Sequence, residues 1–238
     1  MKKLYMMMLL ASILNLTGCN TEIDNWDYPT SQINGRFLYN GEPVRIKGTV
    51  TESAVDNMIQ LNQVGPSEYT PGFLKMNARD DGSYTILTFD GNYEMCITPG
   101  RGPWVPLRDT IRFTLSGTKN NVDFNVTPYF WIENYQTTYA DSVFTATFEL
   151  QQVAPAARLR RIVAYFGSTT ILDQASRTVE RAFATPGLGQ RTIRVDLKNF
   201  SATEKRNLAR TGLLFSRIGV QAEGAADLLY SSTTSHTR

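Results

Sequence analysis

Histidine and cysteine are the residue types that this chain has least of. Its 238 residues include one histidine, His236, and two cysteines, Cys19 and Cys96. A Ser-His-Asp or Cys-His catalytic device would depend on a residue third from the end of the chain, and a histidine-ligated metal site lacks its ligands. Cys96 follows Tyr93-Glu94-Met95 in an apolar stretch, which predicts a buried, inert thiol. We therefore expect no enzyme, no cofactor and no metal site.

Long apolar runs are also missing, apart from one near the start. Leu4 to Leu16 is an apolar run of thirteen residues, whereas a membrane-spanning helix needs about 20. Lys2 and Lys3 precede this run, so it predicts the apolar region of an export signal. Leu16-Thr17-Gly18-Cys19 then has the pattern at which lipoprotein signal peptidase cuts. We expect residues 1–18 to be removed and Cys19 to carry a lipid that attaches the protein to a membrane; the alternative is an ordinary thiol just after a secretory signal.

Net charge is the third thing that the mature chain lacks. Loss of Lys2 and Lys3 lowers the 24 basic residues to 22, which equals the 22 acidic residues. A neutral chain argues against nucleic acid, which needs a basic face. The balance differs between the halves, because residues 19–128 carry 9 basic and 13 acidic residues and residues 129–238 carry 13 and 9. This difference favours docking of one half on the other, or reflects two ordinary solvated surfaces.

Residues 19–29 predict a tether. Three acidic residues and no basic one lie in this stretch, which has no hydrophobic periodicity. Acidic residues after a lipidated cysteine resemble the signals that send lipoproteins of Bacteroidetes to the outside of the outer membrane. The location implied by this resemblance is the outer membrane, with the protein exposed at the cell surface.

Residues 30–128 have the pattern of short strands separated by turns. Ile33, Gly35, Phe37 and Tyr39 alternate with polar residues, and the alternation resumes over residues 44–50. Asn40-Gly41 lies between these runs and is a strong signal for a type I′ hairpin turn. Val122, Phe124 and Val126 alternate in the last strand. The segment predicts a β-sandwich of about seven strands.

Residues 129–238 predict a second sandwich, because Pro128 cannot continue a central strand. Alternation over residues 143–150 and a nearly continuous apolar run over residues 159–166 indicate strands. Ser201-Ala202-Thr203-Glu204 has the form of a capping box, which predicts one helix over residues 202–210. The predicted fold is therefore all-β, with two β-sandwich domains in tandem and one short helix in the second.

Four glycine-containing motifs recur in the first half: Gly35-Arg36-Phe37, Gly41-Glu42-Pro43-Val44, Asp81-Gly82-Ser83-Tyr84 and Asp90-Gly91-Asn92-Tyr93. Together they resemble the carboxypeptidase-regulatory, prealbumin-like sandwich. Asp123-Phe124-Asn125-Val126-Thr127-Pro128-Tyr129 is similar to a family of uncharacterised Bacteroidetes lipoproteins encoded beside outer-membrane glycan-uptake transporters. Arg217 to Ala222, followed by Tyr230-Ser231, resembles the last strands of an immunoglobulin-like or fibronectin type III sandwich.

The resembled family has no established activity, so it assigns no functional residues to this chain. The lipidation motif, the acidic stretch, the two predicted sandwiches and the resemblance together favour a non-catalytic surface lipoprotein that binds glycans beside an outer-membrane transporter complex. The alternative is a structural or adhesive surface protein. Residues 99–108 form the most distinctive loop, in which Trp104 lies between Arg101 and Arg108, and Tyr69 lies in another Pro/Gly-bounded loop. Aromatic rings and guanidinium groups of this kind bind sugars, so these four residues are the candidate ligand site. Two other interpretations stay open: Trp104 packs inside the sandwich, and Tyr129 and Trp131 belong to the core between the domains.

Overall fold

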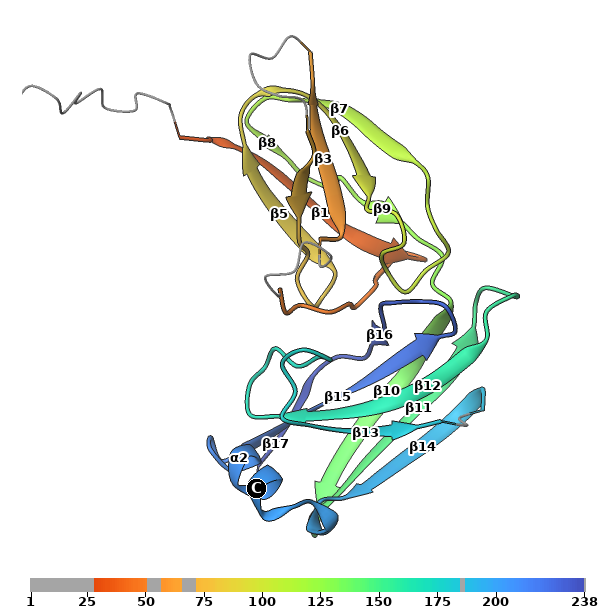
Figure 1. Ribbon diagram of the computed structural model, residues 1–238. Helices are drawn as coiled ribbons and strands as arrows, with labels where there is room; N and C mark the ends of the chain where they lie inside the picture. Colours follow the sequence, from red (N-terminus) through yellow and green to blue (C-terminus); the bar gives the residue numbers. More distant parts are fainter. Residues whose placement is uncertain (1–27, 51–56, 66–71, 185–186, 238) are drawn as a thin grey trace, which may run out of the picture.

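The structure, a computed structural model, describes residues 28–50, 57–65, 72–184 and 187–237. Two domains follow each other along the chain, each with two sheets around an apolar core (Figure 1). The described residues form an all-β fold with one short α-helix, as the alternation of apolar residues and the capping box predicted. Within the described ranges no helix is both long and apolar enough to cross a membrane.

The first domain packs a sheet built around β1 against a sheet of four strands. β1 pairs with β2 and β5 antiparallel and with β8 and β9 in parallel, and the second sheet has the order β4-β3-β6-β7. The strands are β1 Ser31–Tyr39, β2 Glu42–Pro43, β3 Ile59–Val64, β4 Leu74–Met76, β5 Ser83–Thr88, β6 Gly91–Ile97, β7 Thr110–Leu115, β8 Thr118–Lys119 and β9 Phe124–Asn125.

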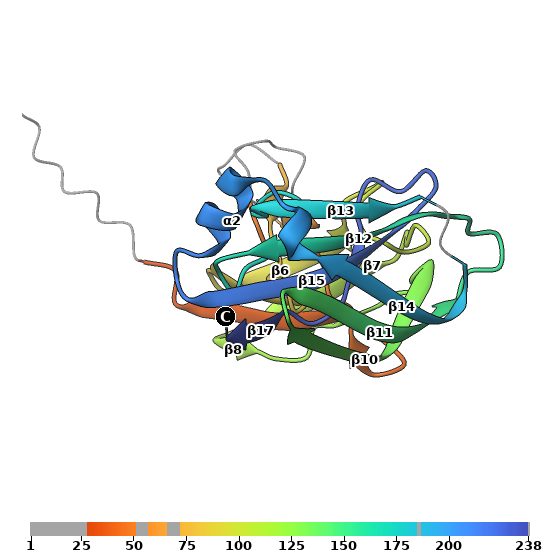
Figure 2. The ribbon, with the colours of Figure 1, turned by 90° about the horizontal axis from the view of Figure 1, so that it is seen from below.

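The second domain packs a three-stranded sheet, β10-β11-β14, against the sheet β13-β12-β15-β16, to which β17 adds through β15. Figure 2 shows the two sheets of this domain from below, with the helix α2 at one side. The elements are β10 Phe130–Ala140, β11 Val143–Gln152, β12 Leu159–Gly167, β13 Val179–Phe183, β14 Gly189–Asp196, the 3-10 helix η1 Leu197–Asn199, α2 Ala202–Leu208, β15 Leu213–Ala222, β16 Leu229–Tyr230 and β17 Thr234–Thr237.

Residues 44–50 differ from the prediction, since no strand forms there. Val44 and Ile46 point into the core as their alternation requires, but their backbone N–H groups bond singly to the carbonyls of Phe37 and Asp80. The alternation in this segment therefore indicates which side chains are buried, but the backbone does not pair with a neighbouring strand. The segment crosses the end of the first domain and reaches the second.

The joint between the domains is held by buried polar groups. Asp227 accepts bonds from the Arg101 guanidinium at 2.9 Å and from the Gly102 N–H at 2.7 Å. Asp173 accepts from the N–H groups of Gly48 and Thr49 at 3.0 and 2.8 Å. Burial alone would raise the pKa of Asp173, but hydrogen bonds from Thr49 and from the backbone N–H groups of Ala175 and Ser176 outweigh it and hold that pKa below its usual value.

Arg217 is the third buried polar group at the joint. Its guanidinium donates to three carbonyl oxygens, those of Ser231, Leu172 and Asp80, at 2.9, 3.0 and 2.9 Å. Asp80 belongs to the first domain and the other two to the second. Both buried carboxylates of the joint also come from the second domain, whose net charge is positive. Individual bonds between the domains, and not the opposite net charges of the two halves, account for the docking.

Candidate functional site at the domain joint

Trp104, the centre of the predicted ligand loop, is buried and only 1% exposed. Its ring lies 4.7 Å from that of Phe37 between centroids, and its backbone forms a bridge to Pro128. Gly102 makes room for the indole, because a Cβ there would lie 2.0 Å from a Trp104 ring atom. Trp104 therefore fills one end of the first sandwich and cannot stack on a ligand, which corrects its assignment as a ligand-binding residue.

The other residues of the predicted ligand site do not gather around Trp104. Arg101 is mostly buried and its guanidinium binds Asp227 of the second domain, so it holds the joint. Arg108 is exposed. Tyr69 lies outside the described residues. The first part of the predicted loop, residues 101–103, thus contacts the second domain at the joint.

A different aromatic pair is accessible at the same joint. Tyr39 ends β1, and Trp131 is the second residue of β10. Their ring centroids are 5.2 Å apart with the planes at 61°, an edge-to-face contact, and both side chains are partly exposed. The chain reverses directly after Tyr39 through Asn40 and Gly41, whose φ angles of 51° and 83° fit the predicted type I′ turn. This turn places the Tyr39 ring over the second domain.

Carboxylates and an amide surround Trp131 on the outer face of β10 and β11. Trp131 pairs with Gln151 and Glu133 with Glu149 in the ladder, so the four side chains share one face of the sheet. The Gln151 Nε2 donates to Glu133 Oε2 at 2.8 Å. We call Tyr39, Trp131, Glu133, Glu149 and Gln151 the joint platform.

A β-bulge ends the platform along β10. The register shifts between Glu133 and Gln136, and Asn134 has a φ of 52°. Bulges bend a strand and redirect its side chains, often next to binding sites. The platform therefore offers two partly exposed rings with hydrogen-bonding groups of both kinds, which is the arrangement that stacks on a sugar face and binds its hydroxyls.

The sequence contained a signal for this site that the loop-based prediction missed. Trp131 was interpreted as core between the domains, and one edge of its ring does pack there against Tyr39. The period-2 pattern of β10 and β11 nevertheless places Trp131, Glu133, Glu149 and Gln151 opposite the buried Phe130 and Leu150. What the pattern could not supply is Tyr39, which is 92 positions away from Trp131 in the sequence.

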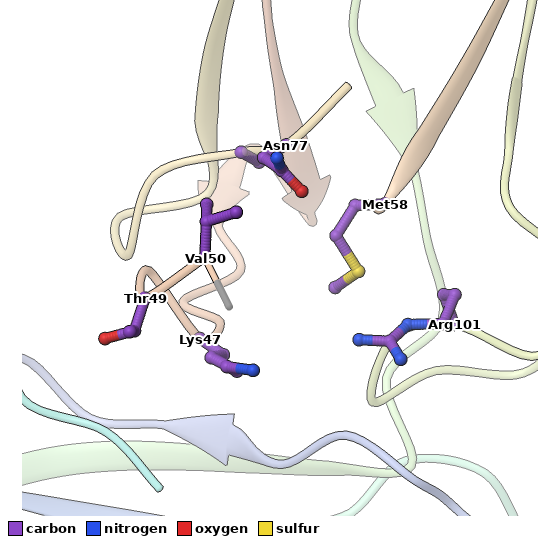
Figure 3. A pocket seen from close by; sticks show the side chains of 7 residues that line it. Lys47, Thr49, Val50, Met58, Asn77 and Arg101 are labelled. Carbon is purple, nitrogen blue, oxygen red and sulfur yellow. The ribbon is translucent and has the colours of Figure 1, made fainter. Parts of the chain in front are cut away.

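A small hollow also lies at the end of the first domain, lined by residues of that domain alone. Lys47 and Arg101 reach toward it from opposite sides, and Met58 lies at its edge (Figure 3). Its volume of about 10 Å³ is room for one water molecule. It is too small to admit a sugar ring.

His236 and Cys96 are the two described residues that a nucleophilic catalytic device would most readily use. His236 lies in β17 and not in a frayed tail, with Nε2 3.2 Å from the Ser216 hydroxyl. Ser216 is fully buried, and burial lowers the pKa of His236, so the contact is structural. Burial raises the pKa of the Cys96 thiol, and the negative charge of Glu94 raises it further. A thiol with a raised pKa is less reactive. Among the described residues no group of three His, Cys, Asp or Glu could hold a metal ion.

Fold and platform define a two-domain β-sandwich protein with a partly exposed aromatic pair at the joint. Two family models match the chain: the N-terminal domain of DUF3823, a protein family of unknown function, over residues 31–127, and the domain of unknown function DUF3823_C over residues 130–235. The chain belongs to the DUF3823 family. This confirms the resemblance to an uncharacterised family of Bacteroidetes.

Solved structures show the same two-domain fold. A DUF3823 protein from Parabacteroides merdae is 28% identical and superposes with a TM-score of 0.75, covering 88% of this chain and 99% of that one. A DUF3823 protein from Bacteroides ovatus is 24% identical, with a TM-score of 0.72 and the same coverage. A candidate carbohydrate binding protein from Bacteroides uniformis is 19% identical, with a TM-score of 0.67, and covers 88% of this chain and 100% of that one. No curated protein matches the chain.

Proposed function

We propose that this protein is a non-catalytic, carbohydrate-binding lipoprotein of the outer-membrane surface that serves glycan uptake. The observation that carries the proposal is the joint platform, where the Trp131 and Tyr39 rings lie beside Glu133 and Gln151. The description of the Bacteroides uniformis relative supports it.

The platform favours neutral glycans over acidic ones. Glu133 and Glu149 face each other across the ladder, so the polar part of the platform carries two carboxylates, which accept hydrogen bonds from sugar hydroxyls. A uronic or sialic acid would place a third negative charge next to them. We therefore expect binding of neutral oligosaccharides and rejection of acidic ones.

Trp131→Ala should weaken glycan binding about tenfold, which corresponds to about 1.4 kcal/mol, because the stacking surface is lost. The measurement is calorimetry with residues 20–238 and neutral oligosaccharides, after an array has identified a ligand. Tyr28→Ala is the control, since Tyr28 is an exposed aromatic residue at the far end of the first domain. Equal affinity of both variants would remove the platform as the site, and silence against every glycan would favour a structural or adhesive role.

Cys19→Ala should leave the chain unacylated and uncut, because the lipoprotein peptidase acts on a lipidated cysteine. Durable attachment needs at least two acyl chains, each buried CH₂ contributing about 0.8 kcal/mol. Fractionation after an alkaline wash, with mass measurement of the chain, tests this expectation. Cys96→Ser is the matched control and should stay mature and anchored. A Cys19→Ala chain that is processed and retained like the wild type would contradict the proposed anchor.

A further inference from the structure

Exposed apolar side chains gather at one end of the first domain. Six of the eleven large apolar residues that are exposed among the described residues lie there: Tyr28, Val64, Phe73, Leu74, Leu87 and Phe89. We call this set the tether end, because the chain enters β1 here. Scattered single apolar residues are normal on a surface, whereas a gathering of them marks a contact site.

Strand pairing places these residues together and away from the joint. Ser31 at the start of β1 pairs with Thr88 at the end of β5, and Val64 at the end of β3 pairs with Asn92 at the start of β6. Leu74 begins β4, which runs antiparallel to β3. The start of β1 and the ends of β3 and β5 lie at the end of the sandwich opposite the second domain (Figure 1), and Leu74 lies one strand further along the sheet, beside Leu61 in the middle of β3.

Leu87 and Phe89 are two members of the tether end on the same side of one chain segment, β5 and the residue after it. The Leu87 side chain is 61% exposed and that of Phe89 46%. Ile86, which precedes Leu87, and Thr88, which lies between the two, are buried. β5 pairs only with β1 among the described strands, so it forms an edge of its sheet. A leucine and an aromatic residue two positions apart on the outer face of an edge strand are left for a contact outside the domain.

The length of chain before the first domain limits what can lie against this end. Tyr28 follows Cys19 by nine positions, and nine extended residues span at most about 30 Å. A lipid on Cys19 would therefore keep the tether end within that distance of the membrane. We propose that the tether end rests on the lipid surface that holds the anchor, with Leu87 and Phe89 inserted between lipid headgroups. The proposal rests on the lipidation of Cys19 under the proposed function.

The contact would not depend on charge. Asp90, next to Phe89, is satisfied within the domain by the Ser31 hydroxyl and by the Gly117 N–H at 2.9 Å. Two inserted side chains bind weakly alone, but the anchor turns their insertion into an intramolecular step with a high effective concentration. β1 is nine residues long, about 30 Å at strand spacing, so the joint platform at its other end would face away from the membrane.

The test uses the full mature lipoprotein in phosphatidylcholine vesicles. An environment-sensitive fluorophore is attached to Leu87→Cys, in a Cys96→Ser background that leaves one free thiol. The control label is at Thr192→Cys, an exposed position on β14 of the second domain. Insertion predicts a blue-shifted emission at position 87 and quenching by bilayer-borne quenchers at least about twofold stronger than at position 192.

Equal emission and equal quenching at the two positions, with the protein still floating with the vesicles, would overturn the lipid contact and leave the anchor intact. Protein that does not float would overturn the anchor and the contact together. A shift at position 87 that needs native outer-membrane proteins would assign the tether end to a protein partner and would also overturn the lipid contact.

Discussion

Arg217→Met should lower the free energy of unfolding by about 3–5 kcal/mol. The Arg217 side chain is fully buried, and methionine of similar length would leave the carbonyls of Ser231, Leu172 and Asp80 without their donor. The guanidinium also lies 4.4 Å from the Tyr230 ring centroid, a cation-π contact that methionine does not replace.

Urea denaturation measures the loss. Arg112→Met is the matched control, because the Arg112 side chain is 71% exposed and its bond to Glu94 lies on the surface; it should change the free energy of unfolding by about 0.5 kcal/mol or less. Since Arg217 bonds to both domains, the wild type should unfold in one transition and the Arg217→Met variant in two. Equal effects of the two substitutions would show that Arg217 is not a structural centre of the joint.

Gly102→Ala should lower the free energy of unfolding by about 3–5 kcal/mol, as the sum of backbone strain and overpacking. Gly102 has a φ of 93°, and an added Cβ would lie 2.0 Å from the Trp104 ring. Moving that ring disturbs Phe37 behind it and the bond from the Gly102 N–H to Asp227.

Gly100→Ala separates the two contributions. Gly100 has a φ of 75° but no atom within 4 Å of an added Cβ, so it should show only the strain, about 1–2 kcal/mol. Thermal and urea unfolding of the two variants give the difference. If Gly100→Ala were as destabilising as Gly102→Ala, the close packing of the Trp104 ring would not be what requires glycine at position 102.

Local sequence signals predicted the elements whose causes are local. The turn at Asn40-Gly41 follows from two residues that tolerate positive φ. The helix Ala202–Leu208 begins with the predicted capping box, in which Ser201 and Glu204 bond each other's backbone N–H groups. It ends two residues before the predicted limit, within the one or two residues by which helix ends ordinarily vary.

The candidate site depended on contacts that no local pattern encodes. Trp104 has the same flanking prolines whether its ring faces solvent or the core, and the choice is made by Phe37 and Gly102. The pairing of Tyr39 with Trp131 requires the two domains to be docked, and the bonds of Asp173, Asp227 and Arg217 that dock them join residues more than 100 positions apart.

The position of β1 in the first domain also sets the order in which the domain can fold. β1 is the first of the described strands along the chain, yet its bonds to the closing segment of the domain join residues 86 and 87 positions apart, as in the contacts of Asn34 with Asn120 and of Arg36 with Asp123. Until that segment reaches β1, one edge of β1 has no partner and the sandwich stays open. Closing so long a loop is slow, and folding times of about milliseconds to seconds are typical of such topologies. The chain would therefore pass much of the folding of the first domain with its central strand half paired.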